Sequence, residues 1–273
     1  MRQAPPPARE CIISGSCVLK RESLPEVTLS PFVSGECGAT AMSTGAAIFA
    51  SGARLPYHKH SFSEAVTVLE GEALITVEGR CYHLRPFDCI HIPSGIAHEV
   101  VNASNYSFLT ALWAFASPTP SRELVQGQFA KNNRSATEPE PDDPEHVVWF
   151  KKASAYELAT GTEFCDLFAG HLGAVGICGG YGKFRPGSSL PCHVHDYDES
   201  ITIVQGEATC EVGGKRYHLS GCDTAFVPAG RPHRFLNESS NPMAMVWVYA
   251  GDEPARTIVD VGRCSGWLER EKP

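Results

Sequence analysis

The chain has 273 residues, of which 42% are apolar, and its formal net charge is -8. This length suits one large domain or two domains of about 100–150 residues each, and either could bury a core. The acidic balance and the absence of a basic block argue against nucleic acid as a partner, and the apolar runs are too short to predict a membrane span.

The N-terminal segment MRQAPPPARE is polar and rich in proline, and it lacks the apolar run of a secretory signal. We therefore expect a disordered tail at residues 1–10 and a cytoplasmic protein. The 11 cysteines include no Cys-x-x-Cys pair, so a four-cysteine zinc site is not expected. In a cytoplasmic chain they are interpreted as reduced thiols, most of them packed as small apolar residues.

The first half of the chain shows the pattern of short strands. Residues 64–84 (EAVTVLEGEALITVEGRCYHL) contain short apolar and β-branched runs separated by Gly71 and Gly79, which is typical of antiparallel strands. Residues 88–95 (DCIHIPSG) predict a short strand that ends in a Pro-x-Gly turn. Helical patterns are scarce, and the two candidates are residues 121–132 and 266–272.

A linker separates this half from the second. Residues 134–146 (RSATEPEPDDPEH) are acidic and contain three prolines and almost no apolar residue, which is a linker composition. Residues 199–219 and 223–230 then repeat the strand and turn pattern, with Gly213 and Gly214 as a predicted hairpin turn.

The second half is a copy of the first at an offset of 135 residues. Between residues 58–102 and 193–237, 17 of 45 positions are identical without a gap, and the match continues to Trp113 and Trp247 at an offset of 134. Such repetition indicates two copies of one structural unit, and many short strands indicate barrels or jelly rolls. We predict an all-β protein with an N-terminal barrel at residues 11–130, an acidic linker at 131–146, a C-terminal barrel at 147–267 and a tail at 268–273.

Each copy carries the residues of a transition-metal site. Side chains two residues apart on a strand share a face, and a Pro-x-Gly turn directs a third histidine towards them. Three imidazoles and one carboxylate suit Fe, Mn, Co, Ni, Cu or Zn and leave one or two positions free for other ligands. The predicted ligands are His58, His60, Glu64 and His98 in the first copy, and His193, His195, Glu199 and His233 in the second.

Other polar residues close to these sets are given structural interpretations. His83 and His218 lie next to Tyr and Leu in both copies and are interpreted as strand-face residues. His91 has a phenylalanine as its counterpart, so it does not belong to the repeated site. Asp196 and Asp198 are interpreted as a solvated loop, with orientation of a ligand histidine as the alternative.

With these residues identified, the sequence resembles the cupin superfamily, specifically the two-domain bicupins. The first cupin motif, G-x5-H-x-H-x3–4-E-x6-G, is matched by residues 52–71 and again by residues 187–206. The second motif, G-x5-P-x-G-x2-H-x3-N, is matched in both copies except at its leading glycine, where Phe87 and Cys222 stand. The resemblance covers nearly the whole chain outside the tail and linker. It implies two tandem jelly-roll barrels of six or more strands, each with one divalent metal (Fe, Mn, Ni or Zn) near its centre.

The resemblance leaves the reaction open, because cupins include dioxygenases, decarboxylases, isomerases, hydrolases, lyases, cyclases and storage proteins. No nucleophile–base pair or phosphate-binding loop is visible, so chemistry is expected to be centred on the metal. The leading hypothesis is a metal-dependent, dioxygenase-like oxidoreductase that acts on a small organic substrate. A non-redox isomerase, cyclase or lyase and a small-ligand-binding or sensor protein without turnover are the alternatives. The acidic surroundings of the second site favour it as the catalytic one, and we expect a monomer or homodimer.

Overall fold

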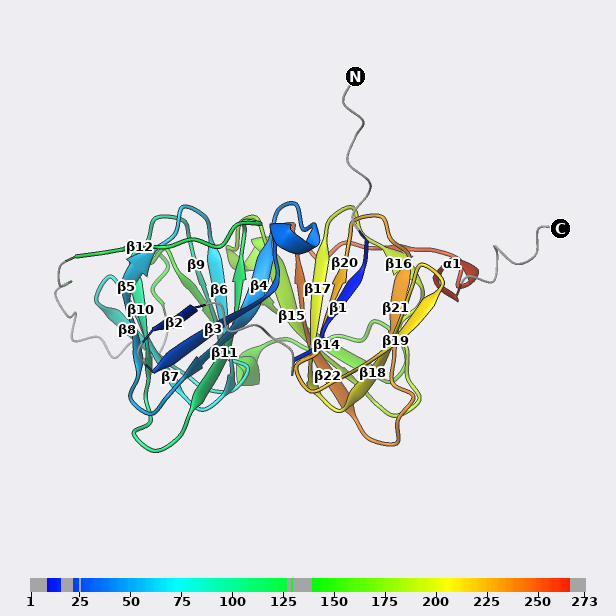
Figure 1. Cartoon of the computed structure of the whole chain (residues 1–273), viewed down its shortest axis with the longest axis horizontal. Coiled ribbons are helices and arrows are strands. Elements are labelled where there is room, and N and C mark those ends of the chain that lie inside the picture. Colours follow the sequence, from blue (N-terminus) through cyan, green and yellow to red (C-terminus); the bar gives the residue numbers. More distant parts are fainter. Residues whose placement is uncertain (1–8, 16–21, 25, 127–128, 130–138, 266–273) are drawn as a thin grey trace, which may run out of the picture.

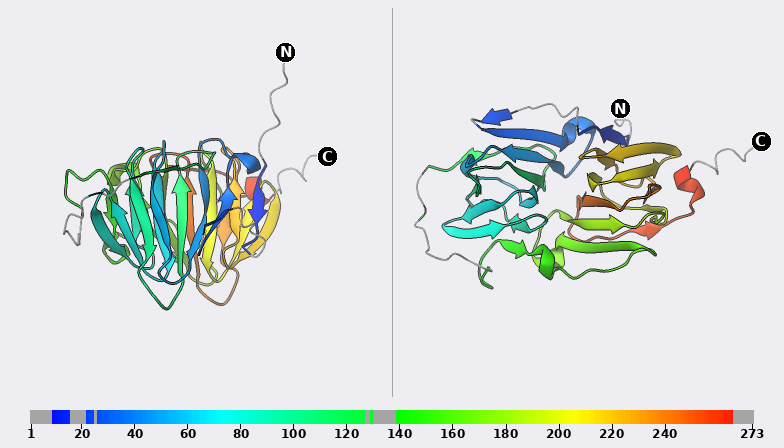
Figure 2. Two further views of the ribbon diagram at one scale, coloured as in Figure 1. Left: turned by 60° about the vertical axis from the view of Figure 1, so that its left-hand side comes forward. Right: turned by 90° about the horizontal axis from the view of Figure 1, so that it is seen from below.

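Two β-barrels lie side by side, one built mainly from each half of the chain (Figure 1). The structure is a computed structural model that describes residues 9–15, 22–24, 26–126, 129 and 139–265. Figure 2 shows the same two barrels from two further directions. The predicted all-β, two-barrel architecture is confirmed. No helix in the described parts of the chain is long and apolar enough to cross a membrane.

The first barrel consists of two antiparallel sheets. Its strands are β2 (Glu22–Leu24), β3 (Val27–Val33), β4 (Ser43–Phe49), β5 (Arg54–Lys59), β6 (Glu64–Glu70), β7 (Ala73–Val77), β8 (Arg80–Leu84), β9 (Cys89–Ile92), β10 (His98–Asn102), β11 (Leu109–Phe115), β12 (Glu123–Leu124) and β13 (His146–Val148). One sheet has the order β13-β9-β6-β11-β4-β3-β2, and the other has the order β12-β5-β10-β7-β8.

The second barrel repeats this arrangement. Its strands are β1 (Cys11–Ile13), β14 (Thr162–Phe168), β15 (Cys178–Phe184), β16 (His193–Val194), β17 (Glu199–Gln205), β18 (Glu207–Val212), β19 (Lys215–Ser220), β20 (Thr224–Val227), β21 (His233–Leu236), β22 (Met243–Tyr249) and β23 (Thr257–Ile258). The sheets have the orders β1-β20-β17-β22-β15-β14 and β19-β18-β21-β16-β23. The short helical turns are η1 (Gly35–Cys37), η2 (Phe150–Lys152), η3 (Gly170–Leu172) and α1 (Gly262–Ser265).

The local sequence explains the hairpins. Along β7 the side chains alternate between buried and half-buried, as the period of a strand with one face in the core requires. Gly213 and Gly214 both have positive φ, at 54° and 82°, and join β18 to β19 as predicted. Glu78 and Gly79 make the same turn between β7 and β8.

Part of one predicted helix is a strand in the structure, and several other predicted segments are not described by it. The helix predicted at residues 121–132 is wrong where the chain is described, because Glu123–Leu124 form β12 and pair with β5. Other predicted segments lie outside the described residues. They are residues 127–128 and 130–132 of the first predicted helix, the second predicted helix at 266–272, residues 1–8 of the expected tail, residues 131–138 of the linker, and the tail at 268–273.

The first strand of each half lies in the barrel of the other half. β1 pairs with β20, with Cys11 opposite Phe226, and β13 pairs with β9, with His146 opposite His91. In Figure 1, β1 (blue) accordingly lies among the strands of the second half. The sequence analysis did not predict this exchange of strands. We keep its ranges, 11–130 and 147–267, as a proposal for where the two repeated units begin and end along the chain.

Buried carboxylates anchor both exchanged strands. Glu10 accepts hydrogen bonds from Lys215 at 2.9 Å and from Arg231 at 2.5 Å. Glu145, at the equivalent position 135 residues later, accepts two hydrogen bonds from Arg80 at 2.7 Å each. These charge-assisted pairs fix the segments before β1 and β13 to the opposite barrel.

The residues that depart from the second cupin motif lie at this exchange. Phe87 and Cys222 have positive φ, at 69° and 67°, so they keep the backbone conformation that favours glycine. The Phe87 ring packs against Phe150 and Tyr181, with centroids 5.2 and 4.8 Å away. The side chain therefore contributes to contact between the halves, which a glycine would not.

Three apolar cores result from this arrangement. One fills each barrel, and a third lies between the barrels and includes Phe32, Met42 and Leu112 from the first half and Phe168 and Val246 from the second. The interior of each barrel is thus closed on the side that faces its partner. Each candidate site lies within its own barrel.

Candidate metal centres

The first centre forms where three strands meet. His58 lies near the end of β5 and His60 follows that strand directly, while Glu64 and His98 begin β6 and β10. His98 is the antiparallel neighbour of His58, and all four residues are buried. The second centre repeats these positions, with the same burial and with His193 opposite His233.

The ligand atoms converge in both centres. In each set of four residues, one nitrogen or oxygen atom per side chain lies within 4.8 Å of the others. The Nε2 atoms of His98 and His60 lie 2.8 and 3.2 Å from Glu64 Oε2. In the second centre, Nε2 of His233 and His195 lie 2.6 and 3.5 Å from Glu199 Oε2. The structure therefore brings together all eight residues singled out from the sequence.

These converging atoms fit a cation. The Nε2 atoms of His60 and His98 and Oε2 of Glu64 are fully buried without a hydrogen bond, as are the equivalent atoms of the second centre. Their short separations lack hydrogen-bond alignment, because the atoms point at a common position. Buried polar atoms without partners are costly, and a cation at that position satisfies all of them. Three nitrogens and one oxygen are donors suited to transition metals.

Backbone carbonyls fix the tautomer of every histidine in the two sets. A carbonyl oxygen only accepts, so Nδ1–H must donate to it, which leaves the Nε2 lone pair directed at the centre. These contacts measure 2.5–3.1 Å in the first centre and 2.7–2.9 Å in the second. The acceptors are the carbonyls of Pro56, Ser121 and Ile96, and of Pro191, Ala255 and Arg231.

The pKa values of one histidine in each centre and of Glu64 also suit a metal. Burial lowers the pKa of His58 and of His193 to about 3, so both imidazoles are neutral. Burial alone would raise the pKa of the Glu64 carboxyl, but His60 and His98 outweigh it and hold that pKa well below its ordinary value. The carboxylate is therefore ionised, as a ligand requires.

The two centres differ in the space beside them. The first opens into a cavity of about 710 Å³ whose walls include Leu29, Phe49, Leu55, Trp113 and Phe115. The cavity beside the second centre is about 160 Å³. The repeated ligand spacing contains no information on cavity size, and the structure assigns the wide, largely apolar cavity to the first centre.

The acidic surroundings that favoured the second centre do not face its cavity. Asp196 is exposed, in keeping with a solvated loop. Asp198 is buried, so that interpretation is wrong for it: its carboxylate accepts hydrogen bonds from the backbone N–H and hydroxyl of Thr40 at 2.7 and 2.8 Å. Asp198 joins the halves rather than acting in a site, and the equivalent Ser63 donates to the Val175 carbonyl.

The other histidines considered in the sequence analysis, His83, His91 and His218, also lie outside the centres. His83 and His218 are exposed on β8 and β19, as predicted. His91 is 1% exposed and faces His146 of the exchanged strand, with ring centroids 6.3 Å apart. Its role in packing between the halves agrees with the structural interpretation.

A short segment from the end of each repeat lines its cavity. We call residues 118–122 the first strap and residues 254–256 the second strap. The first strap lines the wide cavity, and its Ser121 carbonyl holds His60. Beyond it, Val125 N–H donates to the Tyr57 carbonyl, as Val259 N–H donates to that of Cys192. The repeated sequences PSRELV (residues 120–125) and PARTIV (residues 254–259) overlap these straps, but their role was not inferred from the sequence.

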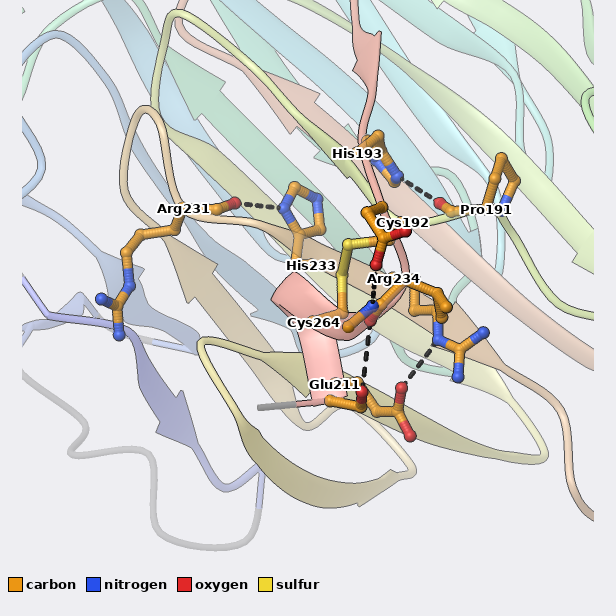
Figure 3. Close-up of a disulfide and its surroundings, with 12 residues drawn as sticks. Pro191, Cys192, His193, Glu211, Arg231, His233, Arg234 and Cys264 are labelled. Carbon is orange, nitrogen blue, oxygen red and sulfur yellow. Dashed lines mark hydrogen bonds and ion pairs between the residues drawn. A yellow bond between two sulfur atoms is a disulfide. The ribbon is translucent and has the colours of Figure 1, made fainter. Parts of the chain in front are cut away.

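A disulfide also holds the chain beside the second centre. Cys192, directly before His193, is bonded to Cys264 of α1 (Figure 3), with Cα atoms 6.0 Å apart. The expectation that all cysteines are reduced thiols is therefore wrong for this pair. The two residues are 72 positions apart, and nothing in their spacing predicts the bond. Eight other cysteines in the described part of the chain are free thiols.

Comparison with known proteins agrees with this geometry. A family model described as "Cupin domain" matches residues 46–115 and 180–249. Quercetin 2,3-dioxygenase of Bacillus subtilis (strain 168) is 31% identical over 104 residues, which is 38% of this chain and 28% of that protein, so the match spans less than a third of the relative.

Solved structures share the two-barrel fold. An oxalate decarboxylase of Lactobacillus farciminis, in a formate complex, is similar with a TM-score of 0.74 at 15% identity, covering 96% of this chain and 90% of that one. The oxalate decarboxylase of B. subtilis at pH 4.6 gives a TM-score of 0.72 at 14% identity, covering 91% of this chain and 78% of that one.

Proposed function

This chain belongs to the cupin family, and on that basis we propose that it is a metal-dependent, dioxygenase-like oxidoreductase. We propose that its first barrel holds the substrate, a small and largely apolar organic molecule. One observation carries this proposal: the ligand set of His58, His60, Glu64 and His98 opens directly into the apolar 710 Å³ cavity. Pockets for organic ligands commonly measure about 300–1,000 Å³ and combine apolar walls with a few polar groups.

We propose that each set of three histidines and one glutamate holds one divalent transition metal, with Fe, Mn, Ni and Zn as the candidates. A metal bound there supplies Lewis acidity, and a redox-active metal also supplies electrons for reaction with dioxygen. The carbonyls of Pro56, Ser121 and Ile96 accept from the Nδ1–H groups of the three imidazoles of the first centre, so that each Nε2 faces the centre. The Glu64 carboxylate adds negative charge that partly neutralises the cation.

The walls of the first cavity position the substrate. Trp113 and Phe115 stack with centroids 4.7 Å apart, and Phe115 also contacts the ring of His60 at 4.7 Å. These aromatic rings exclude water from the centre and favour a flat apolar substrate against it. The first strap contributes Pro118 and Pro120 to the wall of the cavity.

The sequence relative supports the oxidative hypothesis, since it is named as a dioxygenase. The non-redox isomerase, cyclase or lyase and the binding or sensor protein become outcomes of the test. The apolar core between the barrels supports the proposal of a monomer or homodimer, because barrel pairing already occurs within one chain. Sedimentation of the purified protein would distinguish these two states.

Metal analysis and oxygen uptake test the proposal together. We expect two metal ions per chain, of which His58→Ala and His193→Ala each remove one. Oxygen uptake on flavonols, catechols or diketones should disappear in His58→Ala and persist in the matched His193→Ala. Turnover without oxygen uptake would favour the non-redox enzyme. Metal binding without any turnover would favour the binding protein, and activity that depends on His193 alone would overturn the assignment to the first barrel.

A further inference from the structure

We propose that three pairs of equivalent side chains decide which ligands enter each barrel. The first barrel admits a molecule of two fused rings, whereas the second admits nothing larger than a single ring. This inference rests on the proposed function in one respect, because it treats the first cavity as the substrate site. It deepens that proposal by naming the residues that set substrate size.

The two cavities share a common frame. Leu55 and Trp113 line the first cavity, and their equivalents Leu190 and Trp247 line the second. The ligand histidines of β5 and β16 also occupy equivalent positions, with His58–His98 and His193–His233 ring centroids both 4.3 Å apart. The difference in volume therefore comes from other wall positions.

Three wall positions carry larger side chains in the second barrel. All six residues line their respective cavities, and each second-barrel residue is 1–3% exposed. Buried side chains in a close-packed wall cannot move aside at low cost. The pairs are Leu29 and Phe164, Val100 and Phe235, and Ala111 and Met245.

One of these pairs lies beside the ligands, and another lies on the central strands. Val100 and Phe235 each follow a ligand histidine by two residues on the same strand, so their side chains share its face. Ala111 and Met245 occupy the central strands β11 and β22. A phenylalanine and a methionine therefore fill space in the second barrel that a valine and an alanine leave open in the first.

A hydrogen-bonded pair forms part of the wall of the second cavity. The Tyr156 hydroxyl donates to Asp166 at 2.6 Å, and both residues line this cavity. Tyr156 is held in place by two backbone hydrogen bonds with Phe164, each 2.8 Å long. The equivalent of Asp166 in the first barrel is Pro31, which offers no such partner.

The volumes set the size limits. The second cavity, at about 160 Å³, resembles the apolar cavities of about 150 Å³ that hold one benzene molecule. The first, at about 710 Å³, lies within the range of pockets for much larger organic ligands. The duplicated barrels thus have the same ligand set and different size limits.

Binding of 2-naphthol to the purified metal-loaded chain, measured by equilibrium dialysis, tests the inference. The wild-type chain should bind one equivalent. A filled variant with Val100→Phe and Ala111→Met should lose about tenfold or more in affinity, the factor that corresponds to 1.4 kcal/mol. An opened variant with Phe235→Val and Met245→Ala should bind two equivalents.

The two double variants are matched, since each exchanges the same residue types in opposite barrels. Metal content and the unfolding midpoint show that each variant remains folded, and the single variants Ala111→Met and Met245→Ala replace any double variant that does not fold. No wild-type binding, unchanged affinity in a folded filled variant, or one equivalent in a folded opened variant would overturn the inference. Dialysis does not require turnover, so 2-naphthol binding as expected without oxygen uptake would contradict the proposed function alone.

Discussion

The ion pair between Glu145 and Arg80 gives a quantitative test of the strand exchange. The Glu145 side chain is completely buried, and it accepts two hydrogen bonds from Arg80 at 2.7 Å and one from the Tyr82 hydroxyl at 2.6 Å. Within the described residues, the variant Arg80→Ala leaves a buried carboxylate with only the Tyr82 hydroxyl as a donor. Removing one partner of a buried ion pair typically costs about 3–5 kcal/mol. We expect the free energy of unfolding to fall by that amount, because the Arg80 side chain is only 13% exposed.

The second barrel provides the matched control, Lys215→Ala. Lys215 occupies the equivalent position, but its side chain is 59% exposed, and Glu10 retains Arg231 as a partner. The free energy of unfolding should therefore fall much less in Lys215→Ala than in Arg80→Ala. Urea unfolding, followed by circular dichroism and tryptophan fluorescence, measures both variants under the same conditions. Equal losses in the two variants, or an unchanged midpoint in Arg80→Ala, would refute the reasoning.

Three further variants test other parts of the structure. Cys264→Ser should lower stability by about 4 kcal/mol, because the disulfide closes a loop of 72 residues; the variant's thermal midpoint should no longer respond to reductant. Gly45→Ala would place a methyl group against the Trp113 ring and the Ser30 carbonyl; we expect a loss of about 1–3 kcal/mol in urea unfolding and a changed near-ultraviolet dichroism of that tryptophan. Burial lowers the pKa of His91 from 6.5 to about 4, so the unfolded chain binds the proton more readily and stability falls as pH drops through this range. His91→Phe should reduce that loss, and an identical pH profile of unfolding would contradict the prediction.

The barrel fold and both ligand sets could be predicted from the sequence because their signals are local. Strand residues alternate with a period of two, and His58 and His60 share a face for that reason. The internal repeat then argued against a chance occurrence of this histidine pattern, because the same spacing occurs again at His193 and His195. Such signals depend on residues close together in the chain, and they carry over directly into the structure.

The strand exchange depends on contacts that local sequence does not encode. Residues 10–13 and 145–148 are similar to each other (ECII and EHVV), but local similarity does not specify the sheet edge with which a strand pairs. The bond between Cys192 and Cys264 is equally non-local. The size difference between Ala111 and Met245 is visible in the repeat, but it acquires meaning only once both residues are known to line a cavity.

The exchanged strands also have a consequence for folding. Glu10 meets Lys215 at a separation of 205 residues, so the chain must close a very long loop before β1 can dock. During synthesis, β13 is available to the first barrel soon after the first half is made, whereas β1 cannot pair with β20 until the ribosome has produced most of the second half. We therefore expect the second barrel to be completed last and slowly, as proteins dominated by distant contacts are.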